Sequence, residues 1–330
     1  MLTEFGIDLR ETTEEDKNLP RYSYSALSTY ENCMLQGKLK YIDKNFSQKS
    51  SLAMEIGSIL HKGLEMKANC LMEDREIDYE EIRNVVMNGC DEITEKSKSH
   101  ILGINELKRK YFEEWLESDS NGKTYNEKLE VYFQDVLPTR MESVFWKPIG
   151  CEVPFDFVYD NRIRLTGFID RVDRETATEK LKVVDYKSSK KVFDAAHIKS
   201  PLQMWVYACA CYVMYGEFPS EHEYDFVLLN KRQMSPNICT RGWEKRCIKK
   251  VDKLLNSIDE AKEKDIFPPK PTPLCYWCLF HSDSPNADPK YKGMCPYHSL
   301  WTPQNKNFGV LNPWDPEKKP EVKKKRELIF

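Results

Sequence analysis

The 330-residue sequence predicts an α/β fold in which a mixed central sheet is flanked by helices. Two apolar, β-branched runs, 165–170 and 181–187, are typical of buried strands, and each run ends in acidic or charged residues. A helix opening at Ser200-Pro201 is mostly apolar, so we expect it to pack on that sheet. A charge-laced stretch with helical periodicity predicts a helical insertion over about 66–147, ahead of a core spanning 150–230.

The first part of the chain shows two helices. Residues 1–20 are acidic and end at a proline, and we expect a poorly ordered lead-in. Hydroxyl residues that favour helix N-caps predict a helix over roughly 25–38, with Cys33 inside it. A second helix carries His61 among leucines, where a lone histidine is usually structural.

Strand signals begin at Cys151–Tyr159, and Asp160-Asn161 predicts a tight turn into the following strand. Glu152 stands at the start of the first strand. It could support a nearby site, although we expect a surface residue at a strand end. Later segments predict a strand over 224–229 and a helix over about 240–264.

The hairpin over 165–187 carries the strongest chemical signal. If the chain folds about Ala177 and Thr178, Asp170 lies opposite Asp185, and like charges placed that way repel. A divalent metal is the simplest way to offset this repulsion. Lys187 follows two residues after Asp185, hence on the same strand face, and can reach the same site. The alternative is a hairpin end that carries a solvated surface ion pair.

Cysteines near the C-terminus predict a metal centre. Cys275 and Cys278 have the spacing of two thiolates on one centre, and Cys295 follows after a sixteen-residue interval. With His298 these three would form a zinc site. With Cys33 they would instead form an iron–sulfur site of four thiolates. Eleven cysteines without a secretory signal also favour reduced thiols and a cytoplasmic protein.

The net charge of −3 gives no global cationic field, so a nucleic acid would be held by local basic patches. The longest apolar run is too short to span a membrane. The C-terminal run 318–326 is basic, and the chain ends in Leu328-Ile-Phe330. We expect a solvated tail over 303–330, which could dock on a protein partner.

Five groups of these residues follow one another along the chain. They are Cys33, Gly57–His61, Gly167–Asp170 with Asp185–Lys187, Gln203–Tyr207, and finally Cys275, Cys278 and Cys295. Together they resemble the PD-(D/E)XK nuclease superfamily, specifically its RecB/AddB-like branch with an iron–sulfur cluster. Nucleases of CRISPR adaptation and phage exonucleases are similar. The resemblance implies a single nuclease domain over residues 1–330, with the restriction-endonuclease-like core of that superfamily. It also implies a cluster segment over 275–298 that closes the fold with Cys33.

The resemblance also assigns roles to residues. It implies Mg²⁺ or Mn²⁺ bound by His61, Asp170, Asp185 and the backbone carbonyl of Tyr186, with Asp170, Asp185 and Lys187 as catalytic residues. Gln203 and Tyr207 would lie along the path of DNA. A 4Fe–4S cluster would be held by Cys33, Cys275, Cys278 and Cys295, while zinc with His298 stays open.

The expected function is metal-dependent hydrolysis of DNA phosphodiester bonds in recombination, repair or phage DNA processing, exonucleolytic rather than endonucleolytic. The expected partner is DNA that is single-stranded or has accessible ends. Two alternatives remain. One is a non-catalytic nucleic-acid-binding module with a structural zinc site, and the other is a nuclease directed at RNA.

Overall fold

The computed structural model describes residues 6–45, 52–96, 125–189, 191–194, 198, 202–235, 239–270, 272, 275, 278–281, 284 and 288–295. The chain divides into two compact units. The first consists of Met1–Ser25 and Ser50–Asp252, and the second of Ala26–Lys49 and Lys253–Phe330. The sheet belongs to the first unit.

The first unit is built on a mixed sheet of seven strands in the order β1-β3-β4-β5-β6-β7, with β2 added beside β4. Only two of its pairings, β2 with β4 and β5 with β6, are parallel. The predicted α/β class with a mixed sheet is confirmed. The strands are β1 (Leu9–Glu11), β2 (Arg21–Tyr22), β3 (Trp146–Tyr159), β4 (Ile163–Glu175), β5 (Leu181–Lys187), β6 (Glu221–Phe226) and β7 (Lys231–Met234).

Two hairpins join β3, β4 and β5. Asp160 and Asn161 both have positive φ, as a type I′ turn requires, and Arg162 N donates to Tyr159 O at 3.1 Å. The β4–β5 ladder pairs Arg171 with Val184, which is the register predicted by folding about Ala177 and Thr178. The strand β4 runs on to Glu175, further than the polar sequence predicts.

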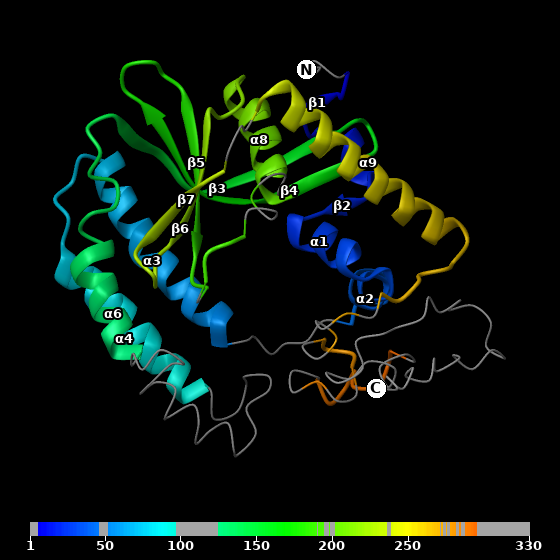
Figure 1. The fold of residues 1–330 in the computed structure, drawn as a ribbon, viewed down its shortest axis with the longest axis horizontal. Coiled ribbons are helices and arrows are strands. Elements are labelled where there is room, and N and C mark those ends of the chain that lie inside the picture. Colours follow the sequence, from blue (N-terminus) through cyan, green and yellow to red (C-terminus); the bar gives the residue numbers. More distant parts are fainter. Residues whose placement is uncertain are drawn as a thin grey trace, which may run out of the picture. The chain divides into compact units, whose positions relative to one another are not determined.

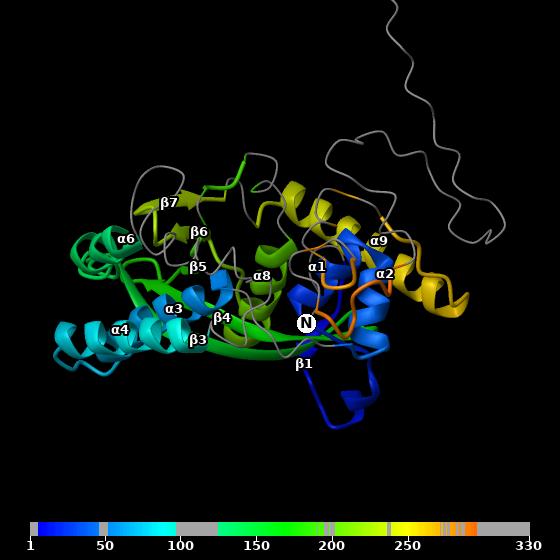
Figure 2. The same cartoon turned by 90° about the horizontal axis from the view of Figure 1, so that it is seen from below.

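Helices α3 (Leu52–Met72), α4 (Tyr79–Lys96) and α6 (Tyr125–Val131), with the π-helical turn η3 (Tyr132–Val136), cover one face of the sheet. Figure 1 and Figure 2 show α3 and α4 side by side along this face. Their buried side chains pack on Val184 and Tyr186 of β5. After η3, Arg140 forms a buried bidentate ion pair with Asp225 of β6, at 2.6 and 2.9 Å. This pair fixes the helical segment to the sheet.

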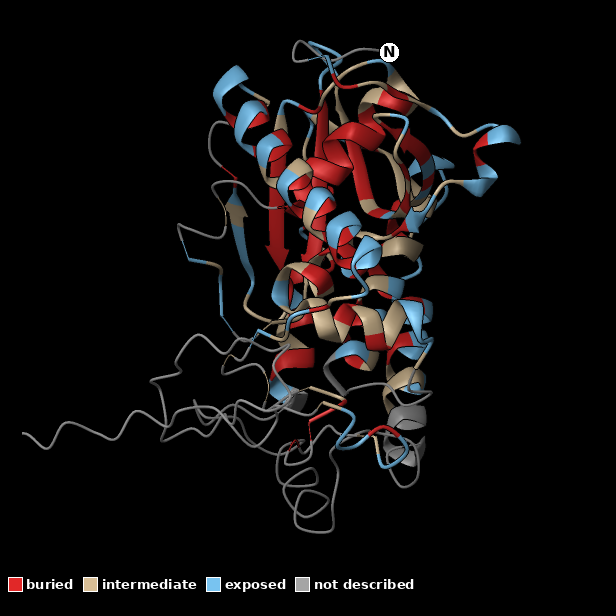
Figure 3. Cartoon of the chain, turned by 90° about the vertical axis from the view of Figure 1, so that its right-hand side faces the viewer, coloured by how far each residue is buried: buried red, intermediate tan, exposed pale blue. Residues whose placement is uncertain are grey.

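Helix α8 (Leu202–Tyr215) covers the other face and connects the parallel strands β5 and β6. Most of its residues are buried, as its apolar sequence predicts (Figure 3). Helix α9 (Arg241–Glu263) contributes Trp243, whose ring meets that of Trp205 edge-on at 5.6 Å. Among the described residues, no helix combines the length and the apolar character needed to cross a membrane.

The sequence predicts that residues 1–20 are poorly ordered, and this prediction is wrong for the part that the structure describes. Residues 9–11 form β1, which pairs with β3, and a 3-10 turn η1 (Glu15–Asn18) follows. The carboxylate of Asp16 accepts hydrogen bonds from Arg10 and from the backbone and hydroxyl of Thr13. These local hydrogen bonds order the acidic segment. The segment has few apolar residues, so its sequence does not indicate a strand.

The second unit contains most of α1 (Tyr24–Asn32), α2 (Met34–Gly37) and the π-helical turn η2 (Lys38–Ile42). The sequence predicts one continuous helix that contains Cys33, and this prediction is wrong. The backbone of Cys33 is extended and separates α1 from α2. A small core of Leu39, Phe280 and Tyr291 packs beside Cys278 and Cys295.

Candidate active site

Strands β4 and β5 part at Asp170, one residue beyond their last paired row. At this point the Asp170 carboxylate accepts a hydrogen bond of 2.7 Å from the backbone N–H of Tyr186. A side-chain oxygen therefore replaces the cross-strand carbonyl, and the acidic group is held in the gap between the two strands.

His61 reaches the same gap from α3. Its Nε2 lies 3.2 Å from the Tyr186 carbonyl, and its ring meets the Tyr186 ring edge-on at 5.5 Å. Gly57, one turn earlier on α3, comes so close to Ser188 that a Cβ atom would lie 3.1 Å from its Oγ. The glycine thus lets the helix approach the end of β5. The local pattern around His61 favoured a structural role, and the family resemblance implied a metal ligand. The structure places His61 beside the acidic residues.

Three potential ligands converge here: His61, Glu152 and Asp170 offer donor atoms that all lie within 4.8 Å of one another. His61 Nδ1 lies 3.9 Å from Glu152 Oε1 and 3.8 Å from Asp170 Oδ2. When Nε2–H donates to the Tyr186 carbonyl, Nδ1 presents a lone pair toward two carboxylate oxygens. One nitrogen and two hard oxygen atoms this close together could hold a divalent cation.

The position of Glu152 differs from the one that the sequence predicts. It lies within β3, not at a surface strand end, and its φ of 48° is rare for a residue with a side chain. The rows on either side, Cys151 with Arg171 and Val153 with Ile169, place it level with Asp170. Counting back from a two-residue turn at Asp160-Asn161 would instead place Glu152 opposite Ile169, so the turn alone does not predict this alignment.

Asp185 has a separate set of partners beside the cluster. Lys187 Nζ forms an ion pair with its Oδ2, as the spacing of the two residues predicts. From α8, Gln203 Nε2 donates to Asp185 Oδ1 at 2.6 Å and to the Tyr207 hydroxyl at 2.9 Å. Lys187 Nζ also donates to Gln203 Oε1 at 3.2 Å. The Gln203–Tyr207 pair therefore orients the acid and the lysine.

The pKa shifts of the site residues follow from their burial and from the charges beside them. Burial lowers the pKa of His61, which keeps the imidazole neutral and able to act as a ligand. Burial raises the pKa of Asp170 well above its ordinary value, and the charge of Asp185 raises it further. Burial opposes protonation of Lys187, but the Asp185 carboxylate outweighs it, so the pKa of the lysine is raised. Negative charge is thus crowded at a site that a cation would stabilise.

The four predicted cluster cysteines all belong to the second unit. Burial raises the pKa of Cys278 to about 12, and the charges of Cys295, Cys33 and Cys275 act on it in the same direction. Cys33 Sγ accepts an N–H hydrogen bond from Lys270 at 3.4 Å, and Cys275 Sγ accepts one from Thr272 at 3.3 Å. Two of the four thiols, those of Cys33 and Cys275, thus accept N–H hydrogen bonds. His298, the fourth ligand of the zinc alternative, lies outside the described residues.

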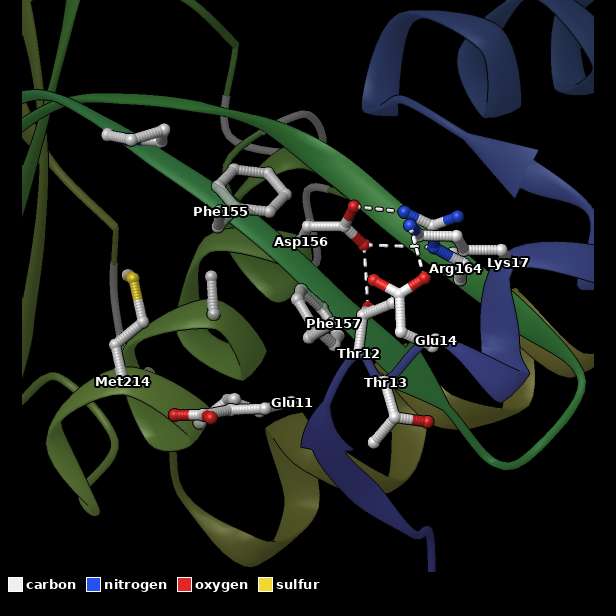
Figure 4. Close-up of a pocket in the computed structure, with 13 residues that line it drawn as sticks. Glu11, Thr12, Thr13, Glu14, Lys17, Phe155, Asp156, Phe157, Arg164 and Met214 are labelled. Atoms are coloured by element: carbon white, nitrogen blue, oxygen red, sulfur yellow. Dashed lines mark hydrogen bonds and ion pairs between the residues drawn. The ribbon is translucent and has the colours of Figure 1, made fainter.

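A separate pocket of about 450 Å³ lies between the N-terminal segment, β3 and α8 (Figure 4). At its rim Asp156 accepts hydrogen bonds from Thr12 and Arg164. Glu11 and Glu14 add further negative charge, which does not suit a phosphate. Its wall residue Phe155 meets Tyr207 edge-on at 6.2 Å. The pocket therefore borders the helix that carries Gln203 and Tyr207 but is not the carboxylate site.

Comparison with known proteins shows what the chain is similar to. Residues 21–282 match the family model of the PD-(D/E)XK nuclease superfamily. The chain is also similar to one of the subunits of the ATP-dependent helicase/deoxyribonuclease from two Clostridium perfringens strains, with 26% identity over 202 residues. That match covers 58% of this chain and 17% of each relative, so the chain spans less than a fifth of their length. Because the family model matches most of the sequence, the chain belongs to the PD-(D/E)XK nuclease superfamily.

Proposed function

We propose that the protein is a metal-dependent DNA nuclease, and specifically an exonuclease, with its active site between β3, β4, β5, α3 and α8. The observation that carries this proposal is the convergence of His61, Glu152 and Asp170 beside the Asp185–Lys187 ion pair. Neither a structural ion pair nor a bare binding surface requires a histidine nitrogen and two carboxylate oxygens within 4.8 Å of one another. The expected setting is recombination, repair or phage DNA processing.

His61, Glu152 and Asp170 would hold Mg²⁺ or Mn²⁺, with Asp185 and the Tyr186 carbonyl as the further ligands that the family resemblance implies. A bound divalent ion polarises a phosphoryl oxygen and lowers the pKa of water. The chain contributes orientation. The Tyr186 carbonyl holds the tautomer of His61, and the Tyr186 N–H holds the carboxylate of Asp170.

Lys187 would contribute charge. Its ammonium is kept protonated by Asp185 and positioned by Gln203, so it can stabilise negative charge that develops on the scissile phosphate. Gln203 and Tyr207, predicted to lie along the DNA path, also bind Asp185 directly. Gln203 and Tyr207 would then have two roles: they would contact the DNA, and they would orient the carboxylate of Asp185.

The direct test is incubation of end-labelled single-stranded DNA, double-stranded DNA and RNA of one sequence with Mg²⁺ or Mn²⁺. We expect mononucleotides or short oligonucleotides to be released from DNA ends, and circular DNA to be resistant. Cleavage of circular DNA would refute the exonuclease assignment. Preference for RNA would favour the RNA-directed alternative, and binding without cleavage would favour the non-catalytic module.

We further propose that Cys33, Cys275, Cys278 and Cys295 hold a 4Fe–4S cluster. Metal-binding free energy contributes to folding free energy, so losing the cluster should destabilise the protein. Protein purified without oxygen should be brown and should contain iron and sulfide, and Cys33→Ser should lose both. A colourless protein with one equivalent of zinc that is insensitive to Cys33→Ser would refute the cluster.

The C-terminal tail over 303–330 lies outside the described residues, and its docking on a protein partner is a proposal. It draws support from the relatives, which are named as subunits. Deleting residues 318–330 should leave hydrolysis of short oligonucleotides intact and weaken capture of a partner. Loss of hydrolysis as well would assign the tail to the single nuclease domain that we propose for the whole chain.

A further inference from the structure

An exposed aromatic side chain lies on β4 two residues before Asp170. Phe168 is 59% exposed, which is unusual for a large apolar residue inside a seven-stranded sheet. Its neighbour Gly167 faces Phe155, because a Cβ atom on Gly167 would lie 2.8 Å from that ring. Successive strand residues point to opposite faces, so Phe168 projects from the face opposite Phe155.

Asp170 projects from the same face as Phe168, since the two are separated by two residues and its carboxylate meets His61. Two residues of strand span roughly 7 Å. Along the edge of β4 that faces β5, the two strands are paired only from Arg171 onward. No residue of β5 is therefore paired with Phe168. The aromatic ring therefore stands at the mouth of the candidate active site.

An exposed cation follows on the same face. Arg21 of β2 is exposed, and its Nε donates to Thr166 Oγ1 at 3.1 Å. Thr166 precedes Phe168 by two residues and therefore shares its face. Along β4 in the direction away from Asp170, this surface thus presents the ring of Phe168 and then the guanidinium group of Arg21 from the neighbouring β2. The neighbouring Arg164 pairs with Asp156, so its charge is already matched.

We propose that this face of β4 holds the unpaired DNA strand next to the scissile phosphate, with Phe168 stacked on a nucleobase and Arg21 bound to a phosphate. Aromatic rings stack on any base, and cations follow the backbone, which is how single strands are bound without sequence preference. Bases inside a duplex are already stacked on each other, so the ring could enter only by unstacking a base step, which costs free energy. The inference rests on the proposed nuclease function and defines its substrate as a single-stranded end.

The test is fluorescence anisotropy of a labelled single-stranded oligonucleotide with the full chain, without divalent metal so that no cleavage occurs. Phe168→Ala and Phe168→Leu should weaken binding by about 5- to 150-fold, whereas Phe168→Tyr should bind like the wild type. Phe145→Ala is the matched control, since Phe145 is 61% exposed but precedes β3 at the other end of the hairpin. Arg21→Gln should reduce the slope of log affinity against log salt by about 0.7.

The outcomes separate this inference from the nuclease proposal. If wild-type protein never cleaves DNA but the variants bind as expected, the β4 surface stands and the nuclease proposal falls. If wild-type protein cleaves DNA while Phe168→Ala and Phe168→Leu bind like it, the β4 surface is refuted and the nuclease stands. An equal loss in Phe145→Ala, or wild-type binding to duplex alone, would also overturn the inference.

Discussion

Arg171 donates a hydrogen bond of 2.6 Å from Nη1 to the hydroxyl of Tyr186, and both side chains are buried. The same guanidinium is held by two hydrogen bonds to Asp173, at 2.8 and 3.1 Å. Tyr186 in turn contacts the candidate site three times, through its N–H, its carbonyl and its ring. The buried arginine therefore fixes the residue that orients both Asp170 and His61.

Tyr186→Phe should weaken metal binding more than it weakens chemistry, because the backbone contacts remain but their anchor is lost. Losing a contact that orients metal ligands typically lowers metal affinity by about 10- to 100-fold. We expect the Mn²⁺ concentration for half-maximal cleavage to rise by about 10-fold, with a nearly normal rate at saturating Mn²⁺. The half-exposed Tyr79→Phe is the control. An unchanged Mn²⁺ requirement would contradict the positioning role.

Glu152→Gln should raise the Mn²⁺ concentration for half-maximal cleavage more than Tyr186→Phe does. The substitution removes a charged donor from the group of His61, Glu152 and Asp170. His61→Ala should be milder at saturating Mn²⁺ if the histidine is one ligand among several. Glu65→Gln is a matched control, because Glu65 lies one turn from His61 on α3 and its charge acts on Glu152. Isothermal titration with Mn²⁺ measures all three. Equal affinities for Glu152→Gln and Glu65→Gln would exclude Glu152 as a ligand.

His222 should make the first unit sensitive to acid. The side chain is fully buried, neither ring nitrogen has a hydrogen-bond partner in the described part of the chain, and burial lowers its pKa from 6.5 to about 3. Between these values the unfolded state binds the proton and the folded state does not, so stability falls as the pH falls below 6.5. The loss is about 1.4 kcal/mol per pH unit.

Urea unfolding of wild-type protein and His222→Leu at pH 5.5 and 7.5 measures this contribution. The wild type should lose about 1 kcal/mol more than the variant on acidification, whatever other groups titrate in both proteins. The same pH dependence in the two proteins would show that His222 does not carry the effect.

The strands around the hairpin could be predicted because their chemistry is local. Apolar runs end at charged residues, and Asp160-Asn161 favours the type I′ turn that joins β3 to β4. The strands β1 and β7 could not be predicted in this way. β1 has three residues and is ordered by pairing with β3 and by the contacts of Asp16, so its stability depends on distant and side-chain partners.

The candidate site was predictable where residues share one strand. Asp185 and Lys187 alternate onto one face of β5, and their ion pair follows from that spacing. The position of Glu152 beside His61 and Asp170 could not be predicted, because it depends on a positive φ and on the position of α3, neither of which has a pattern in the sequence. The contact between His61 and Tyr186 likewise joins residues 125 positions apart.

Asp185→Asn tests the central claim most directly, because it removes the charge that binds Lys187 beside His61, Glu152 and Asp170. Cleavage of labelled single-stranded DNA should be followed against Mn²⁺ concentration for wild-type, Asp185→Asn and Lys187→Ala proteins purified in parallel, with gel-shift binding measured alongside. Both variants should lose at least about 10²–10³ in rate while still binding DNA. Undiminished cleavage by Asp185→Asn would contradict the assignment of this site as the active site.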